Sequence, residues 1–246
     1  AQGWKRDLES SVVSSPALSG KRILVATKEG RVCCLDAGSG EGIWAYDSGE
    51  PIVGGLSLHG NLVVFGTRGS ALICLDLKTG RKVWRARVNG PVVSNPAVSV
   101  DSLYVGTQKG TFYAMDLESG QTLWEYESGQ GIIAGALIVF TSVIFCSQDK
   151  WMYCCEKYDG SLKWKAAVKG RVQASLTTSS KTVIAVSKEG WMQGFDIHIG
   201  QVRWQKNFAT RLESTPLIVK EGMIVASVDG DITYYSFGAE VLKKSA

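Results

Sequence analysis

The chain has 246 residues, of which 45% are apolar, and a formal net charge of +4. By length it could hold one or two domains, and its apolar share is ample for a buried core. No run of 18 uncharged apolar residues occurs, so we expect no transmembrane segment, and we expect no signal peptide. The weak positive charge does not by itself indicate a nucleic-acid partner.

Tryptophan recurs every 40 residues, with no insertion or deletion between the repeats. The six positions are Trp4, Trp44, Trp84, Trp124, Trp164 and Trp204. A fixed period of this length indicates one supersecondary unit that is repeated along the chain. A buried indole removes a large apolar area from water. We therefore interpret these six residues as structural, each packing between neighbouring units.

A turn sequence precedes each of the last five repeated tryptophans. A glycine stands four residues before the tryptophan, and an acidic residue stands four before the glycine, as with Asp76, Gly80 and Trp84. An aspartate carboxylate accepts nearby backbone N–H groups, and glycine adopts positive φ without strain. This pattern predicts a tight turn that leads into the strand of the tryptophan.

The rest of each unit divides into short apolar runs. In the second repeat the predicted strands are Ile43–Tyr46, Pro51–Leu58, Asn61–Thr67 and Ala71–Leu77. The 28 glycines interrupt the chain too often for pairs of long helices. Four-stranded units of this length are typical of the blades of a β-propeller.

The two ends of the chain predict how the array closes. Residues Trp4–Leu8 supply one outermost strand, and Leu212–Leu217, Met223–Val228 and Ile232–Phe237 supply three inner ones. The prediction is an all-β, six-bladed propeller with four antiparallel strands per blade, in which the N-terminal strand closes the last blade and hides a free edge. Residues 1–238 would form this single domain, residues 239–246 a frayed tail, and the protein a monomer.

The six cysteines fall mainly at small-residue positions inside predicted strands, where cysteine acts as a small hydrophobe. No CxxC sequence occurs, so we expect no metal site. Two pairs are adjacent in sequence, Cys33-Cys34 and Cys154-Cys155. Neighbouring side chains of a strand point to opposite faces, so the two sulfurs of a pair are not expected to meet.

The stretch from Cys74 to Trp84, with Asp76, Thr79 and Gly80, resembles the tryptophan-docking motif of pyrroloquinoline-quinone (PQQ) repeat propellers. The likeness recurs along essentially the whole chain, with Glu156 in place of the aspartate as one departure. The resemblance implies one of two roles, since a fold alone does not choose between them. One is a quinoprotein dehydrogenase, and the other is a non-enzymatic scaffold of the BamB type.

The resemblance also says what a quinoprotein would need. Such enzymes hold PQQ with a metal ion and a catalytic aspartate, and they resemble eight-bladed rings with inserted loops. At the predicted channel entrance this chain offers only Gln173 and Glu213, too few oxygen ligands for calcium. We therefore expect a non-catalytic scaffold for protein–protein interaction, with no enzyme activity, no cofactor and no metal. A PQQ-binding enzyme with calcium, or a ligand sensor, is the alternative.

Two tryptophans, Trp151 and Trp191, lie outside the 40-residue period and start the third strand of adjacent blades. Turns predicted on the same face add Lys150, Lys169, Arg171, Lys188 and Arg211. Tryptophan and arginine are typical of binding hot spots. We interpret these seven residues as a surface for a protein partner, one with an extended or acidic segment. The alternative is that both indoles pack between blades and the lysines are solvated.

Other partners and the compartment are less well defined. Acidic residues on the same face interrupt any continuous basic track, so no nucleic-acid partner is expected. A small molecule in the channel stays open. The family resemblance favours the bacterial periplasm or cell envelope, whereas unpaired cysteines favour a reducing, cytoplasmic setting.

Overall fold

The computed structural model describes residues 3–237. The tail predicted for residues 239–246 lies outside the described part, as do Ala1 and Gln2. Residues 3–237 contain strands and turns but no helix, and hence no helix able to cross a membrane. The chain divides into two compact units, Ala1–Glu127 and Ser128–Ala246, which are described separately.

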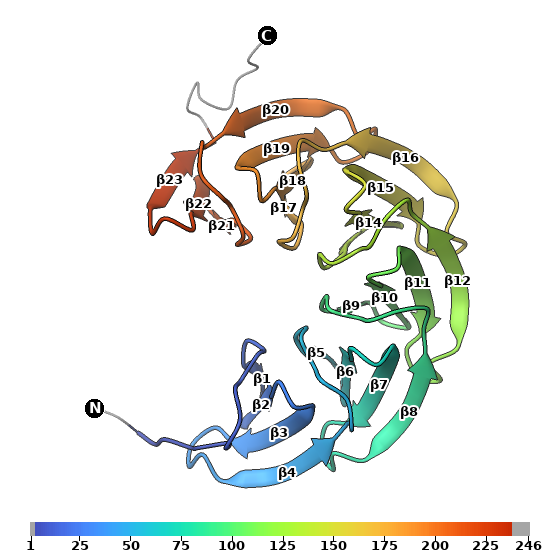
Figure 1. The fold of residues 1–246 in the computed structure, drawn as a ribbon, viewed down its shortest axis with the longest axis vertical. Coiled ribbons are helices and arrows are strands. Elements are labelled where there is room, and N and C mark those ends of the chain that lie inside the picture. Colours follow the sequence, from blue (N-terminus) through green and yellow to red (C-terminus); the bar gives the residue numbers. More distant parts are fainter. Residues whose placement is uncertain (1–2, 238–246) are drawn as a thin grey trace. The chain divides into compact units, whose positions relative to one another are not determined.

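The first unit contains three antiparallel sheets of four strands each (Figure 1). In each sheet the strands follow one another in sequence, so every pair is joined by a short turn. Sheet one has β1 (Ala17–Ser19), β2 (Arg22–Ala26), β3 (Arg31–Asp36) and β4 (Gly42–Asp47). Sheet two has β5 (Ser57–His59), β6 (Leu62–Gly66), β7 (Ala71–Asp76) and β8 (Lys82–Arg87). Sheet three has β9 (Ala97–Val98), β10 (Ser102–Gly106), β11 (Thr111–Asp116) and β12 (Thr122–Glu127).

The second unit repeats this plan, except that its last sheet has three strands among the described residues. Sheet four has β13 (Leu137–Val139), β14 (Ser142–Cys146), β15 (Trp151–Glu156) and β16 (Leu162–Ala167). Sheet five has β17 (Thr177–Ser179), β18 (Thr182–Val186), β19 (Trp191–Asp196) and β20 (Val202–Asn207). Sheet six has β21 (Leu217–Val219), β22 (Gly222–Ala226) and β23 (Ile232–Ser236).

The hydrophobic core of each unit lies between consecutive sheets. Leu24 and Val32 of sheet one pack with Phe65 and Ile73 of sheet two, and a similar cluster joins sheets two and three. In the second unit, equivalent clusters join sheets four and five and sheets five and six. In sheets one to five the second and third strands are largely buried on both faces, which explains why they are continuous apolar runs rather than alternating ones, whereas β23 of sheet six is largely exposed among the described residues.

The repeated tryptophans connect sheets, as predicted from their spacing. In the first unit, the indole N–H groups of Trp4, Trp44 and Trp84 donate hydrogen bonds of 2.9–3.0 Å to backbone carbonyl oxygens 33 residues later. The acceptor is the carbonyl oxygen of Ala37 for Trp4, that of Leu77 for Trp44 and that of Leu117 for Trp84. Each indole therefore projects from its own strand or segment toward the next sheet along the chain, where it packs on the turn after the third strand.

The innermost strands are shorter than the sequence predicts. The run Pro51–Leu58 was expected to be one strand, but only Ser57 and Leu58 of it belong to β5. Similarly, Leu212–Leu217 contributes only its last residue to β21. The residues before these strands make isolated backbone bonds instead, such as Arg68 N–H to the carbonyl oxygen of Pro51 at 2.9 Å. Pro51, Gly54 and Gly55 within the first run, and Pro216 within the second, limit regular pairing.

The predicted N-terminal strand, Trp4–Leu8, does not form a regular strand in the described part of the chain. Residues 3–8 have no strand partner in the described part, although Trp4 makes the same indole contact as Trp44 and Trp84. Strand assignment requires a ladder of backbone hydrogen bonds, and the contact made by Trp4 uses its side chain. Closure of sheet six by residues 1–8 therefore stays a prediction.

Candidate protein-binding surface

Trp151 opens β15 with 36% of its surface exposed. The ammonium nitrogen of Lys165, on β16, lies 4.7 Å from the centre of the indole. The antiparallel register places Trp151 opposite Ala167 and Lys165 opposite Tyr153, so the lysine and the tryptophan are diagonal neighbours on one face. Stacking of a cation on an indole face is attractive and holds the lysine side chain in place.

Trp191 opens β19 and is half-buried. The ammonium nitrogen of Lys169 lies 4.1 Å from its ring centre. Lys169 belongs to the connection between β16 and the inner part of sheet five, and its backbone N–H donates to Oε1 of Gln193 at 2.7 Å. The predicted pair Trp191 and Lys169 is therefore brought together, and both ends of the lysine are held by β19.

The carboxylates on this side of the sheets are already engaged. Asp149 accepts hydrogen bonds from the backbone N–H of Gly129 at 2.9 Å, the backbone N–H of Trp151 at 3.0 Å and the hydroxyl of Tyr153 at 2.7 Å. These three donors stabilise the turn between β14 and β15. Asp149 thus has a structural role in this turn.

Glu189 has the equivalent position in sheet five and binds Arg171. The backbone N–H and Nε of Arg171 lie 2.7 and 3.3 Å from its carboxylate oxygens. Burial raises the pKa of Glu189, but hydrogen bonds, those from Arg171 among them, outweigh it and hold the pKa below its usual value. In sheet six, Arg211 forms an ion pair with Glu213. The two predicted arginines are therefore occupied by carboxylates.

The lysines differ from the arginines in this respect. Among residues 3–237, no ion pair involves Lys150, Lys165, Lys169 or Lys188. Lys150 and Lys188 occupy the turns that precede Trp151 and Trp191. No recorded contact joins the two indoles to each other. The structure thus shows two separate lysine–indole pairs, with an excess of positive charge around them.

The family model for outer membrane protein assembly factor BamB matches the chain in three overlapping segments, residues 1–65, 28–145 and 131–242. The chain belongs to this BamB-like PQQ-repeat family. No curated protein matches it by sequence.

Two solved structures show that the fold is that of a BamB-like β-propeller. BamB from Moraxella catarrhalis superposes with a TM-score of 0.79 at 22% identity, covering 93% of this chain and 72% of that one. A quinohemoprotein alcohol dehydrogenase from Pseudomonas putida HK5 gives a TM-score of 0.70 at 16% identity, covering 83% of this chain and 43% of that one. At these identities the likeness concerns the fold alone.

The structural likeness to a quinohemoprotein dehydrogenase raises the question of whether this chain has the oxygen ligands that a calcium ion would need. Within the second unit, the column predicted to face the channel consists of Ile133, half-buried Gln173 and exposed Glu213. The carboxylate of Glu213 is bound to Arg211. Among residues 3–237, no three His, Cys, Asp or Glu side chains gather as a metal site would require. These donors do not fit a calcium ion, which takes six to eight oxygen ligands.

The six cysteines of this BamB-like chain are all buried free thiols. Burial raises the pKa of Cys74 and Cys155 to about 12 and that of Cys154 to about 11. A thiol is a nucleophile only as its thiolate, so these groups are poorly reactive. The sulfurs of Cys154 and Cys155 are not joined, as expected from their places in one strand.

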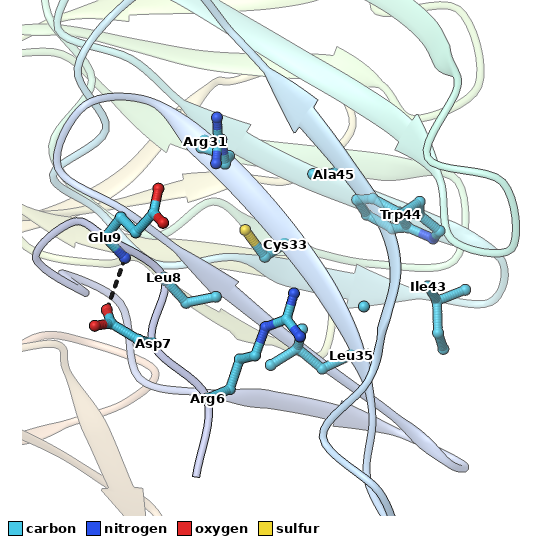
Figure 2. Close-up of a pocket in the computed structure, with 11 residues that line it drawn as sticks. Arg6, Asp7, Leu8, Glu9, Arg31, Cys33, Leu35, Ile43, Trp44 and Ala45 are labelled. Carbon is cyan, nitrogen blue, oxygen red and sulfur yellow. Dashed lines mark hydrogen bonds between the residues drawn. The ribbon is translucent and has the colours of Figure 1, made fainter.

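A cavity of about 370 Å³ beside the N-terminal segment was not foreseen from the sequence. Figure 2 shows Arg6 and Arg31 on either side of the Cys33 thiol, with Leu8 and Leu35 nearby. Burial raises the pKa of Cys33, while the two arginines oppose that shift without cancelling it. Leu8 and Trp4 pack on the apolar face of sheet one that contains Cys33 and Leu35. The cavity thus borders this apolar face on one side and is otherwise lined by charged residues, Arg6, Asp7, Glu9 and Arg31.

Proposed function

We propose that this BamB-like chain is a non-catalytic scaffold that binds protein partners through the surface around Trp151 and Trp191. The observation that carries the proposal is the pair of lysine–indole contacts, Lys165 with Trp151 and Lys169 with Trp191. Each contact holds a positive charge beside an accessible aromatic ring at the same end of adjacent sheets.

These pairs fit a protein segment that is extended and acidic. A large aromatic side chain supplies contact area at low entropy cost, and a lysine beside it supplies charge complementarity. Glu189 is paired with Arg171, and the single charge of Asp149 is outnumbered by Lys150, Lys165, Lys169 and Lys188, which have no ion pair among residues 3–237. An acidic partner would therefore meet a net positive field.

The family supports a binding role of this kind. The model of this family is described as that of an outer membrane protein assembly factor. The M. catarrhalis relative shares the fold over most of this chain. We therefore favour protein binding over catalysis, and the specific partner is to be found by affinity capture from a native extract.

Charge reversal of the two stacked lysines tests this proposal. Lys165→Glu with Lys169→Glu should weaken capture of the identified partner by about tenfold or more, since it places repulsion at both indoles. The matched control is Lys78→Glu with Lys82→Glu, two exposed lysines of sheet two, which should leave capture unchanged. Equal losses in the two double variants would refute the surface.

Replacing both indoles separates binding from folding. Trp151→Ala with Trp191→Ala should abolish capture and lower the melting temperature only moderately, because Trp151 is 36% exposed and Trp191 half-buried, so part of each indole's packing is lost as well. A large drop in melting temperature without a selective loss of binding would favour the packing role instead. Single-stranded DNA serves as the negative probe, and DNA binding that is lost in the same variants would contradict a protein partner.

We also infer that residues 1–238 form one closed, six-bladed, monomeric propeller. Trp4 contacts the turn of sheet one as Trp44 contacts that of sheet two, so residues 3–8 behave as the outer strand of a preceding sheet. Sheet six has three strands where the other sheets have four. By the register of sheet five, closure places Lys5 opposite Thr233. Cysteines at these two positions should cross-link within one chain, whereas cross-links between chains would contradict closure and the monomer.

The alternative function is a PQQ-dependent enzyme or sensor, favoured by the structural likeness to a quinohemoprotein dehydrogenase. Addition of PQQ and calcium, followed by absorbance and thermal shift, tests it directly. We expect no saturable response, because Gln173 and Glu213 supply too few oxygen ligands. A saturable, calcium-dependent rise in melting temperature would instead favour a PQQ-dependent enzyme or sensor.

A further inference from the structure

A cavity of about 450 Å³ lies between sheets two and three, beside the turn from β5 to β6. Figure 1 shows these two sheets side by side in the first unit. Leu117 of sheet three is 2% exposed and belongs to the core cluster on which Leu62 of sheet two packs, and both residues line the cavity. The indole N–H of Trp84 donates to the carbonyl oxygen of Leu117 at 2.9 Å, which joins the two walls. The cavity is therefore preformed.

Two valines that line this cavity are largely uncovered by the protein. Val83, near the start of β8, is 47% exposed, and Val100, in the turn between β9 and β10, is 81% exposed. Single apolar residues at a surface are normal. Here, however, the two valines border one cavity together with Leu62 and Leu117. An apolar group that enters it would lose contact with water against several side chains at once.

The repeat shows that the fold does not require an apolar cavity at this place. The positions of Leu62, Val83, Val100 and Leu117 recur where other consecutive sheets meet within a unit, and none of those junctions is apolar at all four. Residues that the stacked sheets need would recur. We therefore attribute the apolar set to something other than the repeat. The corresponding residues are Arg22, Ile43, Gly60 and Leu77 between sheets one and two, Ser142, Lys163, Ser180 and Ile197 between sheets four and five, and Thr182, Arg203, Lys220 and Phe237 between sheets five and six.

The polar side chains around the cavity mainly offer hydrogen-bond acceptors. Glu118 is exposed and takes part in no ion pair among residues 3–237. The amide nitrogen of Asn61 donates to the carboxylate of Asp76, which leaves the amide oxygen of Asn61 as an acceptor. His59 is the third polar side chain of the lining. A positive group attached to an apolar one matches this combination, because an ammonium group only donates hydrogen bonds.

We infer that this cavity binds a small organic amine, with the aliphatic tail between Val83 and Val100 and the ammonium group beside the Glu118 carboxylate. A volume of about 450 Å³ is that of a site for one small molecule. A protein partner would need a far larger contact surface. Each methylene group that leaves water favours binding, and the carboxylate selects the sign of the charge.

This site is independent of the protein-binding surface in the proposed function. The cavity belongs to the first unit, whereas Trp151 and Trp191 belong to the second. Lys165→Glu with Lys169→Glu should therefore leave amine binding unchanged. Failure of the amine site would leave partner capture as it is, so the two proposals fail separately.

Titration calorimetry of the whole chain with defined compounds tests the inference. The probe is n-hexylammonium. Hexanoate reverses its charge, and methylammonium lacks its tail. Hexylammonium should bind with a Kd of about 1 mM or lower, about fivefold or more tightly than hexanoate and about tenfold or more tightly than methylammonium. An absence of hexylammonium binding, or equal affinity for either matched compound, would overturn the inference.

Variants at matched positions then locate the amine. Val83→Ser should weaken hexylammonium binding by about fivefold or more, whereas Leu123→Ser, at the same position of sheet three and 52% exposed, should leave it unchanged. Val100→Ser should act like Val83→Ser, and at 81% exposure its replacement costs little stability. Glu118→Gln should remove most of the preference over hexanoate. Parent-like binding in both valine variants, or a parent-like preference in Glu118→Gln, would contradict the assigned site.

Discussion

The indole nitrogen of Trp44 lies 3.0 Å from the carbonyl oxygen of Leu77, and the ring lies directly over Gly80. The donor belongs to β4 of sheet one, and the acceptor begins the turn that follows β7 of sheet two. A Cβ atom at Gly80 would approach the ring to 2.5 Å, closer than van der Waals contact allows. The period of 40 residues thus reflects one repeated contact, in which the tryptophan of one sheet packs on the turn of the next sheet.

Gly80→Ala should destabilise the protein by about 2–4 kcal/mol, since it combines backbone strain with overpacking against Trp44. Gly80 has a φ of +69°, which a residue with a Cβ adopts only at a cost. The control is Gly49→Ala, because Gly49 has a φ of +73° but no atom within 4 Å of an added Cβ. Urea denaturation of both variants measures the difference. Equal losses of stability would show that the indole contact adds nothing to the strain.

The indole N–H contributes separately from the ring. In Trp84 it donates to the carbonyl oxygen of Leu117 at 2.9 Å, whereas Nε1 of Trp164 is buried and has no hydrogen-bond partner among the described residues. Trp84→Phe should therefore cost about 1 kcal/mol more than Trp164→Phe, because only the former removes a hydrogen bond and leaves a carbonyl group unpaired. Thermal unfolding of the two variants in parallel gives the comparison, and a larger loss for Trp164→Phe would contradict it.

The repeat made most of the fold predictable. The Asp and Gly positions mark turns whose carboxylates do accept backbone N–H groups, as Asp76 does from Lys78 and Thr79. The small residues of the third strand also have a visible reason, since they lie directly opposite the tryptophan of the fourth strand. These cross-strand pairs are Cys34 with Trp44, Cys74 with Trp84, Ala114 with Trp124, Cys154 with Trp164 and Gly194 with Trp204.

Positions that break the repeat were harder to interpret. Trp151 and Trp191 stood out in the sequence as extra tryptophans, but Lys165 did not, because it belongs to an outer strand and reaches Trp151 only through the register of β15 and β16. Residues that serve the repeat follow its period, whereas the residues that we propose for binding depart from it.

The cysteines should be unreactive while the protein is folded. All six are buried, and burial raises the pKa of Cys74 to about 12, so almost no thiolate exists near neutral pH. A colorimetric thiol reagent at pH 8 should modify fewer than one cysteine per chain over an hour, and six after denaturation. Fast modification of the native protein would show that a strand carrying these residues opens readily. This inertness also leaves engineered cysteines free to report on closure.

Acid should weaken the fold through the carboxylates of the turns. A hydrogen bond from Arg203, with further ones from the turn backbone, lowers the pKa of Asp196 from 3.8 to about 2. Because the folded-state pKa lies below the unfolded one, the stabilisation is fully present above about pH 4 and is lost as the pH falls toward 2. Asp36, Asp76, Asp116 and Asp159 shift in the same direction. The urea midpoint should therefore drop most steeply between about pH 4 and pH 2.

Replacing a single carboxylate, that of Asp196, measures how much this group contributes to the pH dependence of stability. Asp196→Asn should be less stable than the parent at pH 7, and the two midpoints should approach each other as the pH falls through about 2, where the parent aspartate becomes protonated in the folded state as well. Arg203→Gln should flatten the profile in the same window, because it removes the first cause of the low pKa. Arg81→Gln, an exposed arginine with no recorded ion pair among residues 3–237, is the control. Solvent and salt screen exposed ion pairs, so the difference in urea midpoint between parent and variant should become smaller at high ionic strength. A difference that depends on neither pH nor salt would refute the electrostatic origin.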